Sequence, residues 1–260
     1  MQRVRYSQAK AAKLAAVHER LTDAYGPMPW KRRGSGLDVL VAMMLSQNTS
    51  SANAREGFRR LKRDLPTWEE VLAAPVGQIQ SLIGVCGLGR MRAWRLLAIL
   101  RRIKKERGKL SLAHVSRMSR DEAIAYLDSF HGIGPKTIAC TLLFAYSFAI
   151  FPVDNGILRV LRRTGIVRPK AKDVEAAAVV ERHVDGGDRH ALHKLIYRLA
   201  KLHCKPRNPD CRDCPLLDLC PTGQRRIKHK PVQTDPPPKR AKQKTTLAAW
   251  ASAGMRNEED

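Results

Sequence analysis

Apolar residues recur at helical spacing along most of the chain between residues 6 and 203, interrupted by polar or glycine-containing breaks. This pattern predicts helices at residues 6–25, 37–45, 52–65, 76–83, 156–164, 172–183 and 188–203, with a further long helix ending near residue 107. Thr67 and Ser119 each precede a glutamate by three residues, which is the sequence form of a helix capping box. Alternating apolar runs typical of strands are weak throughout, so we expect an all-α fold.

The most informative break is the segment GIGPKT at residues 132–137, which separates two helical stretches. Proline suits the first turn of a helix, where its missing N–H would be unpaired anyway. The segment therefore predicts helix, tight hairpin, helix, and the free N–H groups of such a helix start favour a phosphate. Lys136 lies in that first turn, where the helix dipole favours a neutral amine that can form a Schiff base. A solvated surface lysine beside an ordinary Gly-x-Gly turn is the alternative interpretation.

Composition indicates the class of partner. The 260 residues include 48 Lys and Arg against 24 Asp and Glu, a formal net charge of +24. Residues 223–260 contribute only +5, which leaves +19 on residues 1–222. This excess favours a polyanionic partner, most often nucleic acid, over a merely soluble basic protein. No apolar run has the length of a membrane span or the form of a secretion signal, so we expect an intracellular protein without a membrane partner.

Four of the six cysteines are clustered, with six, two and five residues between them: Cys204, Cys211, Cys214 and Cys220. Clustered thiols in a reducing compartment indicate a metal site and not disulfides. Zinc sites usually pair cysteines as two CxxC knuckles, and only one is present here, so the uneven spacing favours a cuboidal iron–sulfur cluster over zinc. The isolated Cys86 and Cys140 are expected in the core.

Taken together, the GIGPKT hairpin, the Val153-Asp154 pair and the C-x6-C-x2-C-x5-C quartet resemble the endonuclease III family over residues 8–222. These proteins are helix-hairpin-helix DNA glycosylases of base excision repair. The resemblance implies two α-helical domains with double-stranded DNA bound across the cleft between them. A six-helix domain would cover residues 31–142. Residues 1–30 and 143–222 would form a second domain, whose C-terminal loop carries a 4Fe–4S cluster on the four cysteines.

The resemblance also implies roles for single residues. Lys136 would be the nucleophile and Asp154 the catalytic carboxylate, while Gln47 and Leu88 would fill the gap that a flipped base leaves. Read alone, Asp154 is a helix N-cap, and Gln47 and Leu88 are a loop polar residue and an anchoring apolar one. Further DNA contacts are expected from two hairpin glycines and from cations between the cysteines: Gly132, Gly134, Lys205, Arg207 and Arg212.

The implied chemistry is base removal followed by strand cleavage. Attack of Lys136 on the anomeric carbon would release the base, and the resulting Schiff base would acidify the adjacent sugar position for β-elimination. Asp154 would stabilise the positive charge that develops on the sugar or help deprotonate the amine. We therefore expect a DNA glycosylase with AP lyase activity, with oxidised pyrimidines as the default substrate.

Several positions depart from the family pattern. His131 and Phe130 stand where the family generally has Pro and Leu, and Asn155-Gly156 replaces the Thr-His that usually follows Asp154. Because the missing histidine would adjoin the catalytic carboxylate, the base preference stays open. Two alternatives remain: a monofunctional mismatch glycosylase in which Lys136 only contacts DNA, and a non-catalytic binder of damaged DNA.

Residues 223–260 contain four prolines, many basic residues and no periodic core pattern, which predicts a disordered basic tail. KRAK at 239–242 has the form of a nuclear-import signal, so we expect a nuclear protein in a eukaryote and a cytoplasmic or nucleoid protein otherwise. KTTLAAW at 244–250 loosely resembles a sliding-clamp-binding peptide, with a short amphipathic turn as the alternative. A monomer is expected.

Overall fold

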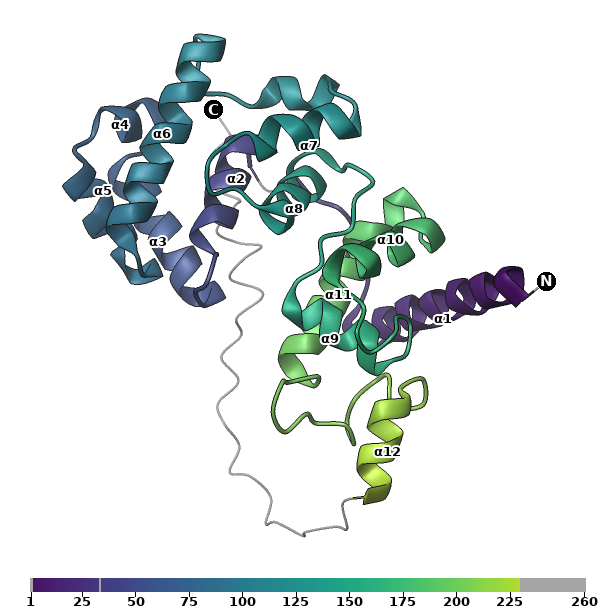
Figure 1. Ribbon diagram of the computed structural model, residues 1–260. Helices are drawn as coiled ribbons and strands as arrows, with labels where there is room; N and C mark the ends of the chain where they lie inside the picture. The colour runs from purple at the N-terminus through teal and green to yellow at the C-terminus, as the bar shows by residue number, and fades with distance from the viewer. Residues whose placement is uncertain (1, 33, 230–260) are drawn as a thin grey trace, which may run out of the picture.

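The computed structural model describes residues 2–32 and 34–229, which contain helices and no strand (Figure 1). The all-α prediction is therefore confirmed for these residues. Within them, no helix combines the length and hydrophobicity that crossing a membrane requires. The bounds are α1 (Gln2–Tyr25), α2 (Gly36–Leu45), α3 (Ser51–Asp64), α4 (Trp68–Ala73), α5 (Val76–Ile83), η1 (Gly84–Cys86), α6 (Gly89–Arg107), η2 (Ala113–Arg117), α7 (Arg120–Asp128), α8 (Pro135–Tyr146), α9 (Asn155–Arg163), α10 (Asp173–His183), η3 (Gly186–Asp188), α11 (Arg189–Leu202) and α12 (Pro221–His229).

Both capping boxes that the sequence predicts are present. The Thr67 side chain accepts a hydrogen bond from the N–H of Glu70, and the Glu70 carboxylate accepts one from the N–H of Thr67, so that α4 begins at Trp68. Ser119 and Glu122 do the same at the start of α7. These local bonds satisfy backbone donors that a helix start would otherwise leave open.

The helices α2 to α8 enclose one hydrophobic core, which runs from Leu37 to Ile150. α2 packs along α8, and α5 packs along α6. Leu40, Leu96 and Phe130 are among its fully or almost fully buried side chains. This group forms the upper left part of Figure 1 and includes the predicted hairpin between α7 and α8.

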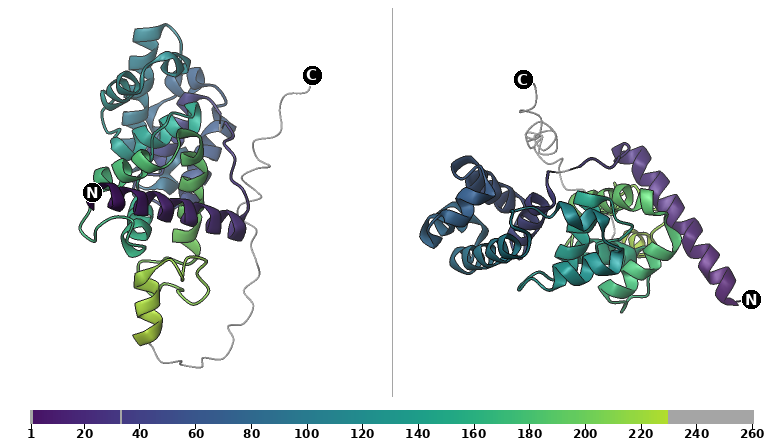
Figure 2. Two further views of the ribbon diagram at one scale, coloured as in Figure 1. Left: turned by 90° about the vertical axis from the view of Figure 1, so that its right-hand side faces the viewer. Right: turned by 90° about the horizontal axis from the view of Figure 1, so that it is seen from above.

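A second core is built from chain segments that are far apart in the sequence. α1 contributes Leu14, α9 contributes Ile157 and α11 contributes Leu195, all with no exposed surface. Figure 2 shows α1 along the outside of this group, where it contacts α10 and α11. The N-terminal helix therefore packs with the C-terminal part of the chain and not with the helices that follow it.

Polar contacts join the two cores. Arg120 of α7 pairs with Glu181 of α10 at 2.6 Å, and Ser51 Oγ lies 2.8 Å from the hydroxyl of Tyr197 on α11. Because these contacts come from α7 and α3 on one side and from α10 and α11 on the other, they limit relative movement of the two groups of helices.

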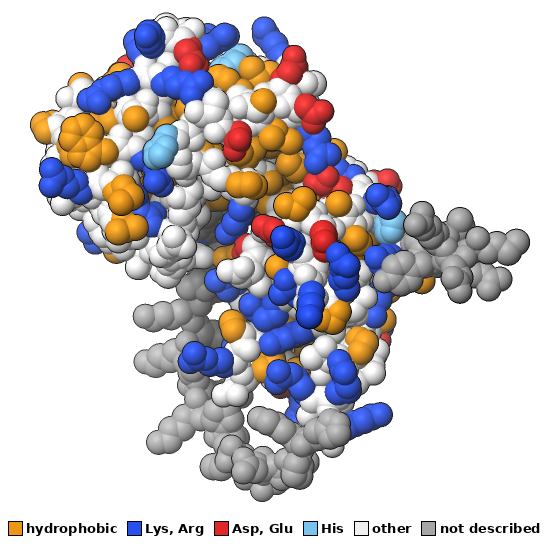
Figure 3. All heavy atoms as spheres, viewed as in Figure 1, with side chains coloured by type: hydrophobic (Ala, Val, Ile, Leu, Met, Phe, Trp, Pro, Cys, Tyr) orange, Lys and Arg blue, Asp and Glu red, His pale blue; other side chains and the backbone are white. Residues whose placement is uncertain are grey.

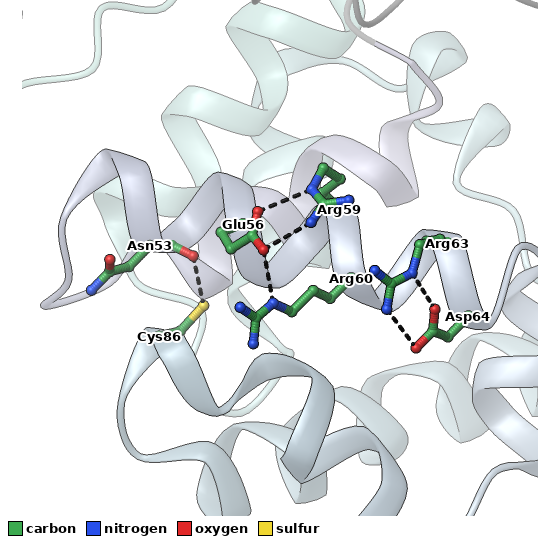
Figure 4. A network of polar contacts seen from close by, with 7 residues as sticks. All are labelled: Asn53, Glu56, Arg59, Arg60, Arg63, Asp64 and Cys86. Carbon is green, nitrogen blue, oxygen red and sulfur yellow. Dashed lines mark hydrogen bonds and ion pairs between the residues drawn. The ribbon is translucent and has the colours of Figure 1, made fainter.

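The isolated cysteines are core residues, as the sequence predicts. Cys86 and Cys140 are buried, and the Cys86 thiol donates to the carbonyl oxygen of Asn53 at 3.4 Å. A Cβ on Gly57 would collide with the Cys86 sulfur, so this glycine allows η1 to approach α3 closely. Figure 4 shows this approach and the ion pairs centred on Glu56 on the exposed side of α3.

The basic tail begins later than the sequence predicts. α12 continues to His229, and the N–H of Gly223 donates to Cys220 Sγ at 3.3 Å. The prediction of disorder is therefore wrong for residues 223–229, because Pro221 starts a helix directly after the last cysteine. The import-like segment at 239–242 and the clamp-like segment at 244–250 lie outside the described residues.

Candidate active site and cysteine loop

The predicted helix-hairpin-helix is formed by α7, the turn at residues 129–134 and α8. Gly132 has a φ of +79°, and a Cβ there would overlap the guanidinium group of Arg95, so both backbone conformation and packing require glycine. Ile133 is buried and anchors the turn in the first core. Gly134 is the N-cap of α8 without a side-chain cap, and Pro135 is the first helical residue.

The hairpin brings Lys136 to Asp154. Lys136 Nζ lies 3.9 Å from Asp154 Oδ2, and the two side chains are 53% and 18% exposed. The second carboxylate oxygen, Oδ1, accepts a hydrogen bond from the N–H of Ile157 at 2.8 Å and thereby caps α9. The cap interpretation of Asp154 is confirmed, and its other oxygen remains directed at the amine.

The family departures have different structural consequences. A Cβ on Gly156 would lie 3.1 Å from Asp154 Oδ1 and 3.2 Å from Ala200 Cβ, so the glycine lets the start of α9 approach α11 closely. A larger side chain would require these neighbours to shift. Phe130 is buried in the first core, whereas His131 is exposed. Of these three positions, only position 156 adjoins the carboxylate.

Gln47, the predicted gap-filling residue, lies against the hairpin. Its amide Nε2 donates to the carbonyl oxygen of Gly132 and to Thr137 Oγ1, each at 3.1 Å. Arg95 Nη1 donates to Gln47 Oε1 at 3.3 Å. Since Thr137 follows Lys136, the loop after α2 and the start of α8 are held together by one amide side chain.

Arg92 is a positioning residue that the sequence analysis missed. Its guanidinium group is buried and donates to the carbonyl oxygens of Met44, Leu45 and Gln47 at the end of α2. Burial lowers the pKa of Arg92, although a guanidinium stays charged at neutral pH. The available signal was its place on the same face of α6 as the buried Leu96.

Leu88, the second predicted gap-filling residue, stands at the start of α6 and is 63% exposed. Gly87 and Leu88 both have positive φ values, +75° and +49°. A left-handed leucine is strained, and here the strain directs an apolar side chain into solvent. The carbonyl oxygen of Leu88 accepts from the N–H of Arg92, so the same arginine connects Leu88 to the Gln47 loop.

The four clustered cysteines line one cavity, bordered by the end of α9 and the beginning of α12. Burial raises the pKa of the Cys214 thiol to about 11 and also raises that of Cys211. Among the described residues, no group of three or more His, Cys, Asp or Glu side chains could hold a metal ion by itself. The structure therefore brings all four predicted ligands to one place without making them converge on a single point.

Two arginines of α9 hold the beginning of the cysteine loop, and the sequence analysis missed both. Arg159 Nε donates to the carbonyl oxygen of Cys204 at 2.7 Å. Arg163 donates to Cys204 Sγ at 3.3 Å and to the carbonyl oxygen of Lys205 at 2.9 Å. α9 thus begins with Asp154 and ends against the cysteine loop.

The three predicted cations of the loop, Lys205, Arg207 and Arg212, are exposed. They lie beyond the end of α9 that is opposite to Asp154. Figure 3 shows Lys and Arg side chains gathered over the part of the surface where α9 and α11 lie. This surface has the charge that a phosphate backbone would require.

Comparison with known proteins is consistent with this geometry. Residues 41–182 match the profile described as HhH-GPD superfamily base excision DNA repair protein. A putative DNA glycosylase of Arabidopsis thaliana is 34% identical over 195 residues, which cover 70% of this chain and 66% of the plant protein. Endonuclease III of Bacillus subtilis is 30% identical over 191 residues, which cover 74% of this chain and 83% of the bacterial protein.

A solved structure of endonuclease III in a trapped covalent intermediate with DNA, an estranged-adenine complex, has the same fold. The TM-score is 0.69 at 23% identity, and the match covers 85% of this chain and 98% of the solved chain. The profile match spans more than half of the sequence and includes the hairpin, Lys136 and Asp154. The chain therefore belongs to the HhH-GPD superfamily of base excision DNA repair proteins, with endonuclease III among its relatives.

Proposed function

We propose that the protein is a DNA glycosylase with AP lyase activity, which removes oxidised pyrimidines and nicks the strand by β-elimination. The observation that carries this proposal is the 3.9 Å separation of Lys136 Nζ and Asp154 Oδ2 at the starts of two helices. An amine beside a carboxylate is the pair that covalent base removal needs, because one group attacks the sugar and the other balances the charge that develops.

In the proposed reaction, Lys136 Nζ bonds to the anomeric carbon of the sugar while the bond from that carbon to the base breaks. The base leaves with the bonding electrons, and Asp154 Oδ2 stabilises the positive charge on the sugar. The Asp154 side chain is already held by its bond to the N–H of Ile157, so little reorganisation is required. The departing base takes the proton that the amine loses, and the ring opens to a Schiff base as its oxygen takes a proton from water. A water molecule then removes a proton from the adjacent carbon, and the 3′ phosphate leaves with the electrons of its C–O bond.

Access to the sugar requires a flipped nucleotide, and we assign that step to Gln47 and Leu88. Gln47 lies beside the turn that precedes Lys136, and Leu88 projects from a strained turn. Two further sets would contact the phosphates: the backbone of Gly132 and Gly134 at the hairpin, and the exposed cations Lys205, Arg207 and Arg212. A solved structure of the same fold holds DNA in a covalent complex, which supports DNA as the partner.

We further infer that the cavity after α11 holds a 4Fe–4S cluster on Cys204, Cys211, Cys214 and Cys220. An all-thiol donor set fits such a cluster, in which each thiolate binds a different iron atom and the sulfurs need not converge on one ion. When bound, the cluster would supply four cross-links to a loop with few other anchors. The two separate hydrophobic cores likewise support two domains, but the first core extends through α8 to Ile150, so we place the boundary near residue 150 and not at 142.

A monofunctional glycosylase is the second candidate, and Gly156 is the observation that favours it. This position lacks the imidazole that the family generally places beside the carboxylate, and Lys136 is exposed enough to serve as a phosphate contact. A wild-type enzyme of this kind would release bases and leave the strand intact.

The test is a panel of duplexes carrying thymine glycol, a G·T mismatch or an abasic site, assayed with and without alkali. The proposal predicts nicks without alkali at thymine glycol and at the abasic site. Nicks at either base lesion only after alkali would establish the monofunctional enzyme. Binding without base release or nicking would establish a non-catalytic binder.

A further inference from the structure

An apolar strip lies on the exposed face of α6. Only its first residue, Leu88, has a role in the proposed function. Leu88, Met91 and Trp94 are 63%, 56% and 51% exposed and follow one another at a spacing of three residues. Together with Gln80 and Arg90 they line a surface hollow of about 550 Å³. Figure 3 shows hydrophobic side chains at the surface over α5 and α6.

The strip is unusual for this molecule. In the part of the chain that the structure describes, six large hydrophobic side chains are exposed, and three of them lie here. Isolated exposed apolar residues need no explanation, whereas a contiguous group beside a hollow marks a binding surface. Trp94 is the largest of the three and presents an aromatic ring to solvent.

The charges around the strip identify the chemistry of its occupant. α6 carries eight Lys or Arg residues and one Glu, and two of these cations, Arg90 and Arg101, are exposed. Aromatic and apolar side chains among cations form the usual surface for unpaired nucleotides, because bases stack on the rings while phosphates meet the charges. A neutral surface would match only the apolar side chains.

The position of the strip connects it to base flipping. It begins at Leu88, and two further residues of α6, Arg92 and Arg95, hold Gln47. α6 therefore carries the gap-filling residue Leu88, the two arginines that hold Gln47, and the exposed ring of Trp94. A flipped nucleotide leaves its partner base unpaired, and that base needs a new stacking surface.

We propose that Met91 and Trp94 form a stacking platform for the unpaired base opposite the flipped nucleotide, with Arg90 near its phosphate. This proposal rests on the DNA-binding part of the proposed function and not on its chemistry. Leu88 enters the gap that the flipped nucleotide leaves. The unpaired base of the opposite strand stacks on the indole of Trp94, and the polarisable thioether of Met91 fills the space between Leu88 and Trp94. The platform would favour large purine bases, which offer more area for stacking.

The experiment measures binding to a duplex that contains a tetrahydrofuran abasic analogue opposite 2-aminopurine, and to the fully paired duplex. The analogue cannot form a Schiff base, so the result does not depend on catalysis. Trp94→Ala is expected to weaken binding to the analogue duplex about tenfold, and binding to the paired duplex by less than about twofold. Trp94→Phe should retain most of the affinity, because it keeps an aromatic face.

Val174→Ala is the matched control, since Val174 is 70% exposed on α10, a helix that packs in the other core. It should leave both affinities unchanged. In the wild-type complex, 2-aminopurine emission should be quenched by stacking, and it should rise in the Trp94→Ala complex.

Three results would overturn the platform. The first is an equal loss of affinity for both duplexes in Trp94→Ala, and the second is no loss of affinity for either. The third is a wild-type dimer in sedimentation that becomes a monomer in Trp94→Ala, which would make the strip a contact between two copies. If the wild type binds the analogue duplex tightly but never nicks a natural abasic site, the lyase proposal fails. The binding of the Trp94 variants still tests the platform in that case.

Discussion

The hairpin and the cysteine loop are both irregular segments beside a helix start, and they are fixed in different ways. The hairpin has Phe130 and Ile133 buried beneath it, and its Gly132 carbonyl is bound by Gln47. Of residues 204–220, in contrast, only Leu216 is buried. Packing therefore suffices for the hairpin, whereas the cysteine loop depends on its polar anchors and on the proposed cluster.

α9 connects these two regions. Its N-cap, Asp154, faces Lys136, while Arg159 and Arg163 hold the beginning of the cysteine loop. Because α9 has only nine residues, we expect a displacement of one end to move the other end as well. Because α9 joins the cysteine loop to Asp154, we expect loss of a cysteine to displace Asp154 more than Lys136.

The largest expected effect is that of Lys136→Gln on strand nicking at an abasic site. Loss of a covalent nucleophile should slow nicking on the order of a thousandfold or more. DNA affinity should change only modestly, because one charge of many is removed. Lys170→Gln is the control, since Lys170 is an exposed lysine outside the proposed DNA contacts. It should nick at nearly the wild-type rate, and an equal loss in both variants would argue against the nucleophile.

Arg92→Met should have the largest effect on stability. It leaves the carbonyl oxygens of Met44, Leu45 and Gln47 without their buried donor, which costs about 3 kcal/mol of unfolding free energy. Arg90→Met, on the exposed face, should change stability by less than about 0.5 kcal/mol. Urea denaturation measures both, and similar midpoints for the two variants would show that Arg92 is not a structural anchor.

Asp154 allows the cap and the chemistry to be separated. Asp154→Asn keeps an N-cap side chain and should retain stability, whereas Asp154→Ala should lose about 1 kcal/mol. Both should slow base release by about a hundredfold, because neither has the negative charge. Melting and single-turnover base release measure the two effects. Normal base release by the Asn variant would restrict Asp154 to its capping role.

Removal of one cysteine ligand should have the smallest of these effects, and it tests the difference between the two regions directly. Purified protein should be yellow-brown, and Cys211→Ser should lose the colour and the iron while the first core stays folded. DNA affinity should fall about tenfold, because the loop cations lose their fixed positions. Cys86→Ala should keep its iron. Colourless wild-type protein with stoichiometric zinc would refute the cluster.

Sequence reasoning succeeded where the signals are local. Pro135 and the Ser119 capping box mark helix starts within a few residues, and the hairpin between them follows from the same short segment. It failed where the signal is tertiary. The bonds from Arg92 to the end of α2 and from Arg163 to the cysteine loop join positions more than 40 residues apart, which no local pattern encodes.

Asp154 shows the limit of the residue-by-residue approach. The sequence offers a cap and a catalytic carboxylate as alternatives, and the structure shows that its two oxygens face different partners. The extent of α12 is a similar case. Composition predicts disorder from residue 223, but a helix that begins at Pro221, directly after the last cysteine, continues to His229.

The most direct test of the account is borohydride trapping of the full-length protein on a duplex with one abasic site, followed by mass spectrometry of the adduct. The account predicts a covalent protein–DNA complex with the wild type, attached through the peptide that contains Lys136. It predicts no complex with Lys136→Gln, although that variant still binds the duplex. An adduct on another amine, or an equally abundant adduct with Lys136→Gln, would contradict the assignment of Lys136 as the nucleophile.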